Sequence, residues 1–513
     1  MTQSAETYQR ERVRVGKVPI STKFFQAVGA LPEAFKGFAF GTFVLFFYNQ
    51  VLGVNAFTAA AVLGSALIID SAIDPLIGSF SDSLKTRLGR RHLLMYLSAA
   101  PLGIGLYLVF SPPHGLGETA LLVWMFATVV LTHISTSVFV VPWTALFAEF
   151  SDDYVERTTI VTWRSAVGLF GGLAFSLFTW RYLFAKTAAY PQGQLNPHSY
   201  TLFAPFVAVA TVAAVLITTQ LTRREIPYLL QPVKATPRFS LVRVWRDIAS
   251  TFVNRNFLIL FIGALLTAGV SGTTDTLGIY MWTYFWGLAG EQLQWFSLAV
   301  FGAVGAFASL GYLGRVFDKK TVLLWTFMLL LIDGMGVVVL RLLHLMPPNG
   351  STLLLVVLVA NETVRAYLGI LLSIIFVSML ADTIDQQELN TGRRQEGIFA
   401  AALAFSGKAT AGVGAVIAGF LLTQIVHWPT HVDPHTLSAA AVTRLGLVAG
   451  VLVPALLIFP FMLGVRYRLT RAAHAEVHAE LERRRAITGA TPPDEGVFEV
   501  EAHVVAPGTE PLV

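Results

Sequence analysis

The sequence contains no cysteine and few charged residues, and both shortages narrow the kind of protein it can be. With no cysteine among 513 residues, disulfide bonds, thiolate metal sites and cysteine nucleophiles are excluded. Charged residues make up 13% of the chain, against about 25% in an ordinary soluble domain, while hydrophobic residues make up 55%. The mean hydropathy is +0.64. A water-soluble fold cannot bury this much apolar surface, so the composition predicts a protein that crosses a membrane many times.

The signatures of enzymes and pumps are lacking as well. The sequence has no HExxH, GxSxG or P-loop motif, and no segment is long enough for the nucleotide-binding domain of a primary pump. We therefore expect neither catalysis nor a bound cofactor. The net charge of +5 comes from lysines and arginines that cluster between apolar runs, which indicates membrane orientation rather than binding of nucleic acid.

Twelve apolar runs, each roughly 20 residues or longer and so able to span a bilayer as a helix, divide into two sets of six. They predict an N-terminal segment without a cleavable signal peptide (1–24), a six-helix bundle (25–221), a central loop (222–256), a second six-helix bundle (257–465) and a tail (466–513). The alanine-rich start of the tail predicts one more helix, and its proline- and acid-rich end predicts disorder. The runs are 25–51, 56–82, 93–111, 120–149, 160–185, 201–221, 257–287, 291–317, 321–343, 352–381, 397–426 and 437–465.

Basic side chains mark alternate connections between the runs. They are Lys85, Arg87, Arg90 and Arg91 after the second run, Arg315, Lys319 and Lys320 after the eighth, and Arg393 and Arg394 after the tenth. The connections SPPHGLGE, GLAGEQLQ and HWPTHVDPHT contain no lysine or arginine. By the positive-inside rule, we expect both termini and the central loop on the cytoplasmic side of a plasma membrane, which is the inner membrane in a Gram-negative cell.

One connection pattern occurs in both halves. GSFSDSLKTRLGRR follows the second run and GYLGRVFDKKT follows the eighth. A basic loop alone fits any membrane protein, but the repeated glycine and aspartate resemble the signature loop of the major facilitator superfamily. That resemblance implies an all-α fold of twelve transmembrane helices in two six-helix bundles around a central cavity. It also implies cytoplasmic gating loops that contain Asp82, Arg87, Arg90, Arg91 and Asp318. Because Asp82 lies beside a basic loop, we interpret it as neutralised by basic partners.

Ionisable residues inside the runs are functional candidates, because each costs at least ~2.5–3.5 kcal/mol to insert into the membrane. We interpret three of them more simply: Glu362 and Arg365, spaced i and i+3, as a neutralising pair, and Asp333 as a partner of loop cations. His133 is expected to be a packing residue. The remaining candidates are Glu33, Lys36, Asp70, Asp74, Arg164, Asp275 and Lys408.

The stretch DSAIDP places Asp70 and Asp74 four residues apart, on one face of a helix. Two ionised carboxylates at this spacing repel each other strongly in a medium of low dielectric constant. Either one carboxylate holds a proton or a cation lies between them, and a hard cation such as Na⁺ prefers oxygen ligands. The alternative is that basic partners neutralise both and merely tie helices together; we favour the functional interpretation.

DSAIDP with RLGRR, VVPWTALFAEFSDDYVERTTIVTWR and MLADTIDQQELNTGRRQEGIFAALAFSGKATAG together resemble the glycoside–pentoside–hexuronide:cation symporters, the melibiose permease family. The resemblance covers about residues 25–466. It implies that Asp70 and Asp74 form the cation site, with Ser137 in place of a family threonine. It further implies that Arg164 contacts bound sugar and that Lys408 links the cation and substrate sites.

The sequence also departs from this family. Ile73 replaces an asparagine that helps bind Na⁺, which leaves Na⁺ and H⁺ both open as coupling ion. Four residues replace groups that read the sugar: Val140, Ser373, Leu403 and Ala404. Vertebrate lysophospholipid carriers share the DxxxDP pattern and the lysine, and an amphiphilic substrate would suit the apolar replacements Val140, Leu403 and Ala404.

We therefore predict a secondary transporter, a symporter that couples Na⁺ or H⁺ to a small organic solute by alternating access. A glycoside or other sugar is the first expectation, with Glu33, Lys36 and Asp275 available as replacement polar contacts, and an amphiphile such as a lysophospholipid is the alternative. A non-transporting receptor on the same fold is a third class, but it would be expected to have lost the two carboxylates. The expected partners are the solute and the lipid bilayer, and a monomer would suffice.

Overall fold

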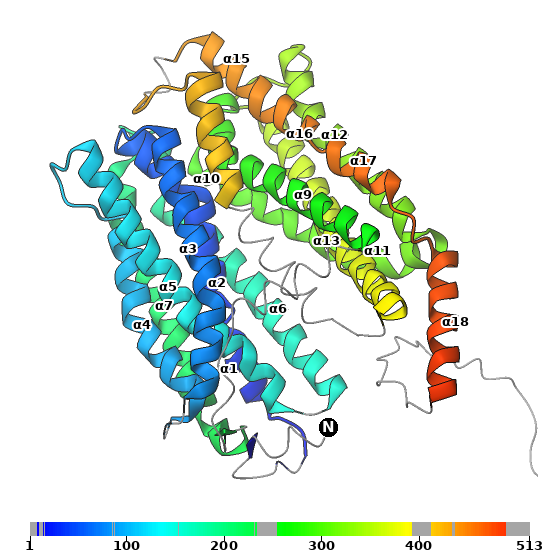
Figure 1. The fold of residues 1–513 in the computed structure, drawn as a ribbon. Helices are drawn as coiled ribbons and strands as arrows, with labels where there is room; N and C mark the ends of the chain where they lie inside the picture. Colours follow the sequence, from blue (N-terminus) through cyan, green and yellow to red (C-terminus); the bar gives the residue numbers. More distant parts are fainter. Residues whose placement is uncertain are drawn as a thin grey trace, which may run out of the picture.

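The computed structural model of the protein is a pair of helical bundles, with the first half of the chain at the left of Figure 1 and the second half at the right. It describes residues 8–9, 14, 16–84, 86, 88–151, 153–229, 231–232, 254–391, 412–432 and 437–488. Several residues and segments singled out in the sequence lie outside this part of the chain: Lys85, Arg87, Arg393, Arg394, Leu403, Ala404, Lys408 and the end of the tail.

The helices of the first half begin at side chains that cap them. Asn55, Asp153 and Asn196 each accept hydrogen bonds from backbone N–H groups of the first helical turn, which would otherwise lack partners. In chain order, with η for π-helical and 3₁₀ turns, the helices are α1 (Ile20–Val28), α2 (Leu31–Ala39), η1 (Phe40–Val44), η2 (Phe47–Val51), α3 (Ala56–Ser83), α4 (Gly89–Val109), α5 (Glu118–Phe150), α6 (Tyr154–Phe178), η3 (Thr179–Leu183), η4 (Gly193–Leu195), α7 (Pro197–Thr222) and η5 (Arg223–Tyr228).

The second half repeats this succession of long apolar helices. Asn254 and Asp318 cap the helices that follow them in the same way. The helices are α9 (Arg255–Tyr280), η6 (Met281–Phe285), α10 (Gly290–Leu293), η7 (Gln294–Ala299), α11 (Val300–Val316), α12 (Lys319–Leu342), α13 (Thr352–Thr391), η8 (Leu421–Val426), α15 (Ala439–Leu447), η9 (Val448–Leu452), α16 (Val453–Ala455) and α17 (Ile458–Arg466).

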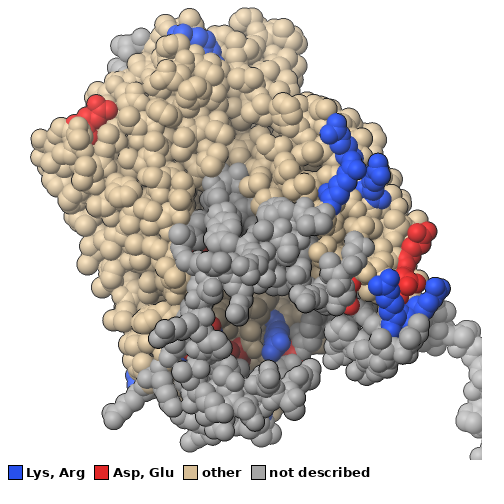
Figure 2. All heavy atoms as spheres, in the orientation of Figure 1, with Lys and Arg blue, Asp and Glu red and all other residues tan. Residues whose placement is uncertain are grey.

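Eleven helices within the described ranges are long and apolar enough to cross a membrane, and Gly412–Val426 is a shorter apolar helix. The predicted run 397–426 begins outside these ranges, so the count of twelve stays a prediction. The broad surface at the left of Figure 2 has Lys, Arg, Asp and Glu only near its upper and lower ends. An uncharged belt between charged ends is what a bilayer requires.

Hydrogen bonds join the two halves at the upper end of Figure 1, and the bundles diverge toward the lower end. Gln50 Nε2 donates to the carbonyl oxygen of Pro429 at 3.2 Å, and Tyr284 Oη donates to Gln50 Oε1 at 2.5 Å. Gln194 Nε2 donates to Thr283 Oγ1 at 3.1 Å. Pro429 lies in the connection HWPTHVDPHT, and Thr283 and Tyr284 come shortly before the connection GLAGEQLQ. Neither connection contains lysine or arginine, so the halves meet at the end that the sequence predicts to be extracellular.

Close packing of glycines holds the helix Gly412–Val426 against α3. A Cβ atom on Gly419 would lie 2.6 Å from the carbonyl oxygen of Ala56 and 2.4 Å from Ala60 Cβ, and a Cβ atom on Gly64 would lie 2.4 Å from Val416 Cγ2. Only glycine permits this approach, as is common between membrane helices.

Two small elements lie outside the bundles. The pair β1 (Tyr8–Gln9) and β2 (Gln231–Pro232) is antiparallel and joins the N-terminal segment to the central loop. The tail forms α18 (Arg471–Thr488), which packs beside α13. A helix was predicted in the tail, whereas the strand pair was not.

Candidate functional site

Asp70 lies in the interior of the first bundle, on α3, with 2% of its surface exposed. Ser137 Oγ on α5 donates a hydrogen bond to Asp70 Oδ1 at 2.7 Å. His133 Nδ1, one helical turn from Ser137, lies 3.5 Å from Asp70 Oδ2. The structure therefore brings together two of the three residues predicted for the cation site.

Asp74 follows one turn later on the same helix, which continues through Pro75. Its side chain is half-buried, and its spacing from Asp70 places the two carboxylates on one helix face. Proline within a membrane helix is tolerated where neighbouring helices satisfy the freed backbone carbonyl. Because the helix is continuous, Asp70 and Asp74 keep the i, i+4 arrangement from which a cation site was predicted.

A basic side chain reaches the same site through His133. Lys36 Nζ on α2 lies 3.2 Å from His133 Nδ1, and the Phe40 ring meets the imidazole edge to face at 5.3 Å. His133 is packed, as expected, and it also links Lys36 to Asp70. No pattern in the sequence indicates this link, because the three residues lie on three different helices.

Arg164 lines a cavity of about 460 Å³ at the inner side of the first bundle. Its guanidinium carbon lies 3.9 Å from the ring centre of Trp143 and 5.2 Å from that of Phe147. Such a stack on aromatic faces stabilises a guanidinium while leaving N–H groups for a ligand. Glu33 on α2 lines the same cavity, so the structure places these two candidates side by side.

The second bundle contains a larger cavity, of about 700 Å³, with an ion-pair network in its wall. Arg365 Nη2 lies 3.3 Å from Asp275 Oδ1, and Arg365 Nη1 lies 3.4 Å from Glu362 Oε1. The predicted pair of Glu362 and Arg365 is therefore confirmed, with Asp275 as a further partner. Two-thirds of the Asp275 side chain is exposed, so this carboxylate remains open to a ligand.

The expected pairing of Asp333 with loop cations is wrong. Asn361 Nδ2 donates to Asp333 Oδ1 at 2.7 Å, and Asn361 belongs to the wall of the same cavity. Asp333 is fourteen residues into α12, about 20 Å along the helix from its first lysine, Lys319. The negative charge of Asp333 suggested a partner in the basic loop before α12, but the distance along the helix places those lysines out of reach.

Aromatic rings complete this second cavity and were missed in the sequence. Trp282 and Trp286 line it, and the Trp282 ring meets Phe296 at 5.3 Å with an angle of 61°. The segment YMWTYFW at the end of the seventh run was the available signal. Its aromatic residues also fit ordinary packing, so the sequence could not separate the two roles.

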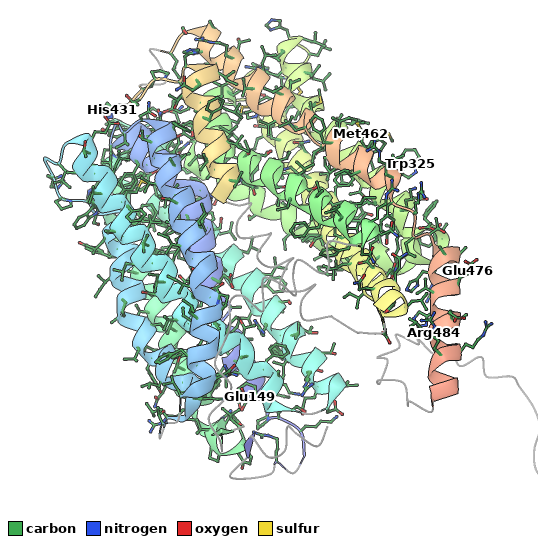
Figure 3. The ribbon with its side chains drawn as sticks, in the orientation of Figure 1. Glu149, Trp325, His431, Met462, Glu476 and Arg484 are labelled. Carbon is green, nitrogen blue, oxygen red and sulfur yellow. The ribbon has the colours of Figure 1, made fainter. Side chains whose placement is uncertain are left out.

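The loops predicted to gate the transporter contain ion-pair clusters at the end of each half opposite the joined end, where Glu149 lies in Figure 3. Arg91 Nη2 lies 2.8 Å from Asp82 Oδ1 and 3.0 Å from Glu149 Oε1. Arg90 Nη2 lies 2.7 Å from the same Glu149 oxygen. The neutralisation expected for Asp82 is confirmed, and Glu149 is a missed member of the cluster.

The corresponding loop of the second half uses different partners. Lys319 Nζ donates to both carboxylate oxygens of Asp382 at 2.8 Å. Asp318 accepts hydrogen bonds at 3.0 Å from the backbone N–H groups of Lys320 and Arg471. Asp318 therefore joins the loop to the tail helix instead of to an arginine of its own loop.

The comparison with known proteins agrees with this architecture. The uncharacterized symporter YnaJ of Bacillus subtilis (strain 168) is 26% identical over 451 residues, which cover 86% of this chain and 90% of that protein. The isoprimeverose transporter of Lactiplantibacillus pentosus is 24% identical over 428 residues, covering 82% and 83%. The nucleoside transporter NupG has the same fold, with a TM-score of 0.59 at 14% identity over 88% of this chain and 99% of NupG.

Residues 25–471 match the family model described as MFS/sugar transport protein. This range contains both bundles and every candidate residue in them. The chain therefore belongs to the MFS/sugar transport protein family and is a multi-pass membrane transporter, not an enzyme.

Proposed function

We propose that this transporter is a symporter that couples Na⁺ or H⁺ to the movement of a glycoside or other sugar by alternating access. The observation that carries the coupling is the buried carboxylate of Asp70, held by the Ser137 hydroxyl at 2.7 Å and one helical turn from Asp74. A carboxylate at such depth is expensive unless its charge is compensated. Two of them on one helix face form a site that a cation or a proton completes.

Lys36 and His133 suggest how occupancy of this site is communicated. The ammonium group lies 3.2 Å from the imidazole, which lies 3.5 Å from Asp70. The resemblance assigns a similar role to Lys408. Binding of a cation or proton at Asp70 weakens the attraction for these basic groups, so their side chains are freed to take another arrangement. Differential affinity for two arrangements is what coupling requires.

Polar and aromatic groups on both halves favour a sugar as the transported solute. The first half offers Arg164, Glu33 and Trp143, and the second offers Asp275 and Arg365 beside its own aromatic wall. Sugar recognition needs several hydrogen bonds, and a flat ring gives the apolar face of a sugar a contact surface. These groups take the place of the family's aspartate, which is Val140 here, and of its sugar-stacking tryptophan, which is Ser373 here.

An amphiphilic substrate fits this wall less well. The apolar replacement at Val140 suits an acyl chain, but Arg365, Asp275 and Glu362 line the larger cavity. An acyl chain that covered them would remove water from charged groups without replacing their hydrogen bonds, which is costly.

The test is the thermal midpoint of the purified protein in detergent, measured with Na⁺ or K⁺ and two ligand panels. One panel contains glycosides, pentosides and hexuronides, and the other contains lysophospholipids. A ligand that binds only the folded state raises the midpoint by mass action. We expect a sugar to raise it, more strongly in the presence of the coupling cation.

Asp74→Asn should remove the dependence on the cation, whereas Glu118→Gln, at the opposite end of the bundle, should keep it. A sugar shift that responds to pH and not to Na⁺ would make the proton the coupling ion. A shift with lysophospholipids alone, above the effect of mixing detergents, would contradict the proposed substrate.

A further inference from the structure

Two histidines of the tail helix and one aspartate of α13 converge at the end of the second bundle where the tail docks. His474 Nε2 lies 3.1 Å from Asp385 Oδ2, and His478 Nε2 lies 3.9 Å from the same oxygen. One ligand atom from each residue can be chosen so that all three lie within 4.8 Å of one another. All three side chains are partly buried, and the transport mechanism proposed above uses none of them.

The residue types and their spacing match a metal site. Histidines at positions i and i+4 face the same side of a helix, and such a pair with a third ligand from elsewhere is a common zinc-binding arrangement. Two donors bound to one zinc ion at about 2.0–2.1 Å are roughly 3.4 Å apart in tetrahedral geometry, so small side-chain rotations suffice. Imidazole favours zinc and its transition-metal neighbours over Mg²⁺ and Ca²⁺.

We propose that Asp385, His474 and His478 form a binding site for a divalent ion of the zinc type, which fixes the tail helix to α13. Water completes the coordination. Glu476, between the two histidines, is exposed and lies on the outer side of α18 in Figure 3. Glu476 therefore does not face the metal, and we assign the site a structural role in docking the tail helix.

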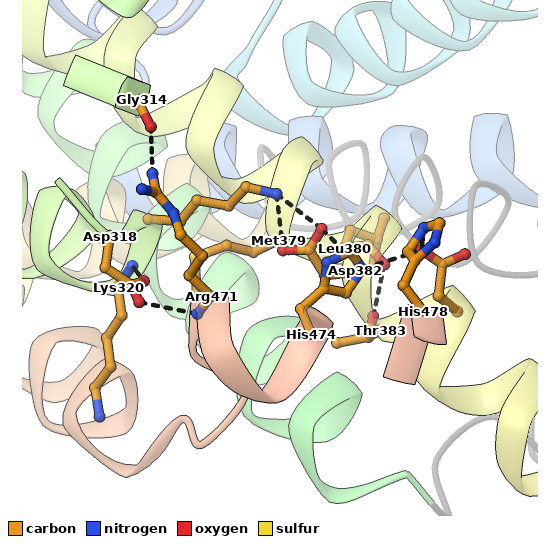
Figure 4. Close-up of polar contacts among 12 residues, drawn as sticks. Gly314, Asp318, Lys320, Met379, Leu380, Asp382, Thr383, Arg471, His474 and His478 are labelled. Atoms are coloured by element: carbon orange, nitrogen blue, oxygen red, sulfur yellow. Dashed lines mark hydrogen bonds and ion pairs between the residues drawn. The ribbon is translucent and has the colours of Figure 1, made fainter. Parts of the chain in front are cut away.

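Neighbouring contacts already hold the three ligands in place. Figure 4 shows His474 and His478 facing the same segment of α13 as Asp382, and Arg471 bound to the loop before α12. Asp382 Oδ1 lies 3.7 Å from His474 Nε2, but both oxygens of Asp382 accept hydrogen bonds from Lys319. Asp385 is therefore the carboxylate ligand, and the docked helix is organised in advance of metal binding.

The experiment is a titration of the full chain with Zn²⁺ alone, against a fluorescent zinc indicator, after purification by a tag without histidine. The hydrogen bond to Asp385 raises the pKa of His474, so the titration is run above neutral pH, where protons compete less with the metal. We expect the wild type to bind zinc at one site. The double variant His474→Ala/His478→Ala should lower the zinc affinity by at least about 100-fold, because losing even an outer-shell partner of a metal site costs 10–100-fold.

The matched control is His427→Ala/His431→Ala, an exposed pair with the same spacing, of which His431 lies at the far end of the molecule in Figure 3. It should bind zinc like the wild type. Asp385→Asn should weaken zinc binding while its thermal midpoint in EDTA stays that of the wild type, which separates loss of a ligand from misfolding.

Trypsin gives an independent readout, because α18 contains exposed arginines such as Arg483 and Arg484. Zinc should slow cleavage there in the wild type and in the control, and not in the His474→Ala/His478→Ala variant. Zinc binding that is equal in all variants, or undetectable in the wild type, would overturn the proposal. Neither result would bear on the proposed symport, because its cation and solute sites use none of these three residues.

Discussion

The two halves of the chain share one architecture but compensate their interior carboxylates differently. In the first half, Asp70 is almost fully buried against the neutral hydroxyl of Ser137, beside an imidazole. In the second half, Asp275 faces a cavity and is paired with the permanent charge of Arg365. The guanidinium of Arg365 is always protonated, so it neutralises Asp275 without a further cation. Near Asp70, the histidine and the lysine can give way to a bound cation or proton. This contrast supports our proposal that the coupling ion binds in the first half, and it makes Asp275 a candidate for solute contact rather than for cation binding.

The ion pairs of the two repeated loops show a second difference. The cluster of Arg90, Arg91 and Glu149 is buried, with 6–8% of each side chain exposed. Its counterpart in the second half contains the pair of Lys319 and Asp382, and the Lys319 side chain is 41% exposed. The cost of breaking such a pair depends on its burial, because solvent screens exposed charges much more than buried ones. The repeated loop motif alone gives no hint of this inequality.

The sharpest test of the comparison replaces one carboxylate in each half. Asp70→Asn should lower cation-driven sugar uptake by roughly 100-fold or more, since removing one member of a buried charged network costs about 2–5 kcal/mol. Asp275→Asn should lower sugar affinity by about 10-fold, the loss of one hydrogen bond to a charged group, and keep the cation dependence. Uptake and binding in vesicles with imposed Na⁺ or pH gradients measure both. If the Asp275 variant alone lost its cation dependence, the coupling ion would have to be assigned to the second half instead of the first.

The ion-pair clusters predict a difference in stability. Glu149→Gln removes the buried carboxylate that Arg90 and Arg91 share and leaves them the more exposed Asp82, so it should lower the free energy of unfolding by about 3 kcal/mol. Lys319→Ala removes a half-exposed cation and should cost about 0–1 kcal/mol. Thermal and denaturant midpoints of both variants in the same detergent provide the measurement. Equal losses would mean that the two clusters are equivalent despite their different burial.

The contact between the halves predicts a smaller effect. Gly419→Ala places a methyl group 2.6 Å from the carbonyl oxygen of Ala56, so it should destabilise the protein by about 1–3 kcal/mol. Gly369→Ala, where nothing lies within 4 Å of the new carbon, should be neutral or slightly stabilising because alanine favours the helix. The midpoints of the two variants, compared with wild type, test whether α3 and the Gly412–Val426 helix depend on this close approach.

Much of the fold followed from periodicity and length. Apolar runs of membrane length located the long helices, and the repeated loop motif indicated two related halves. The helix ends were less predictable. The run at 352–381, for example, becomes the helix Thr352–Thr391, because polar residues such as Asp382 and Asp385 continue it beyond the apolar core. That extension supplies the carboxylates that meet the tail.

The sequence by itself determined the class of protein, because apolar content and run length leave no soluble alternative, and it located Asp70 and Asp74 on one face of one helix. Only the tertiary structure decided which residues from different helices meet. His133 between Lys36 and Asp70, and Asp275 beside Arg365, join residues at least 63 positions apart. Spacing along a chain fixes neighbours within a helix, whereas contacts between helices depend on how their side chains pack.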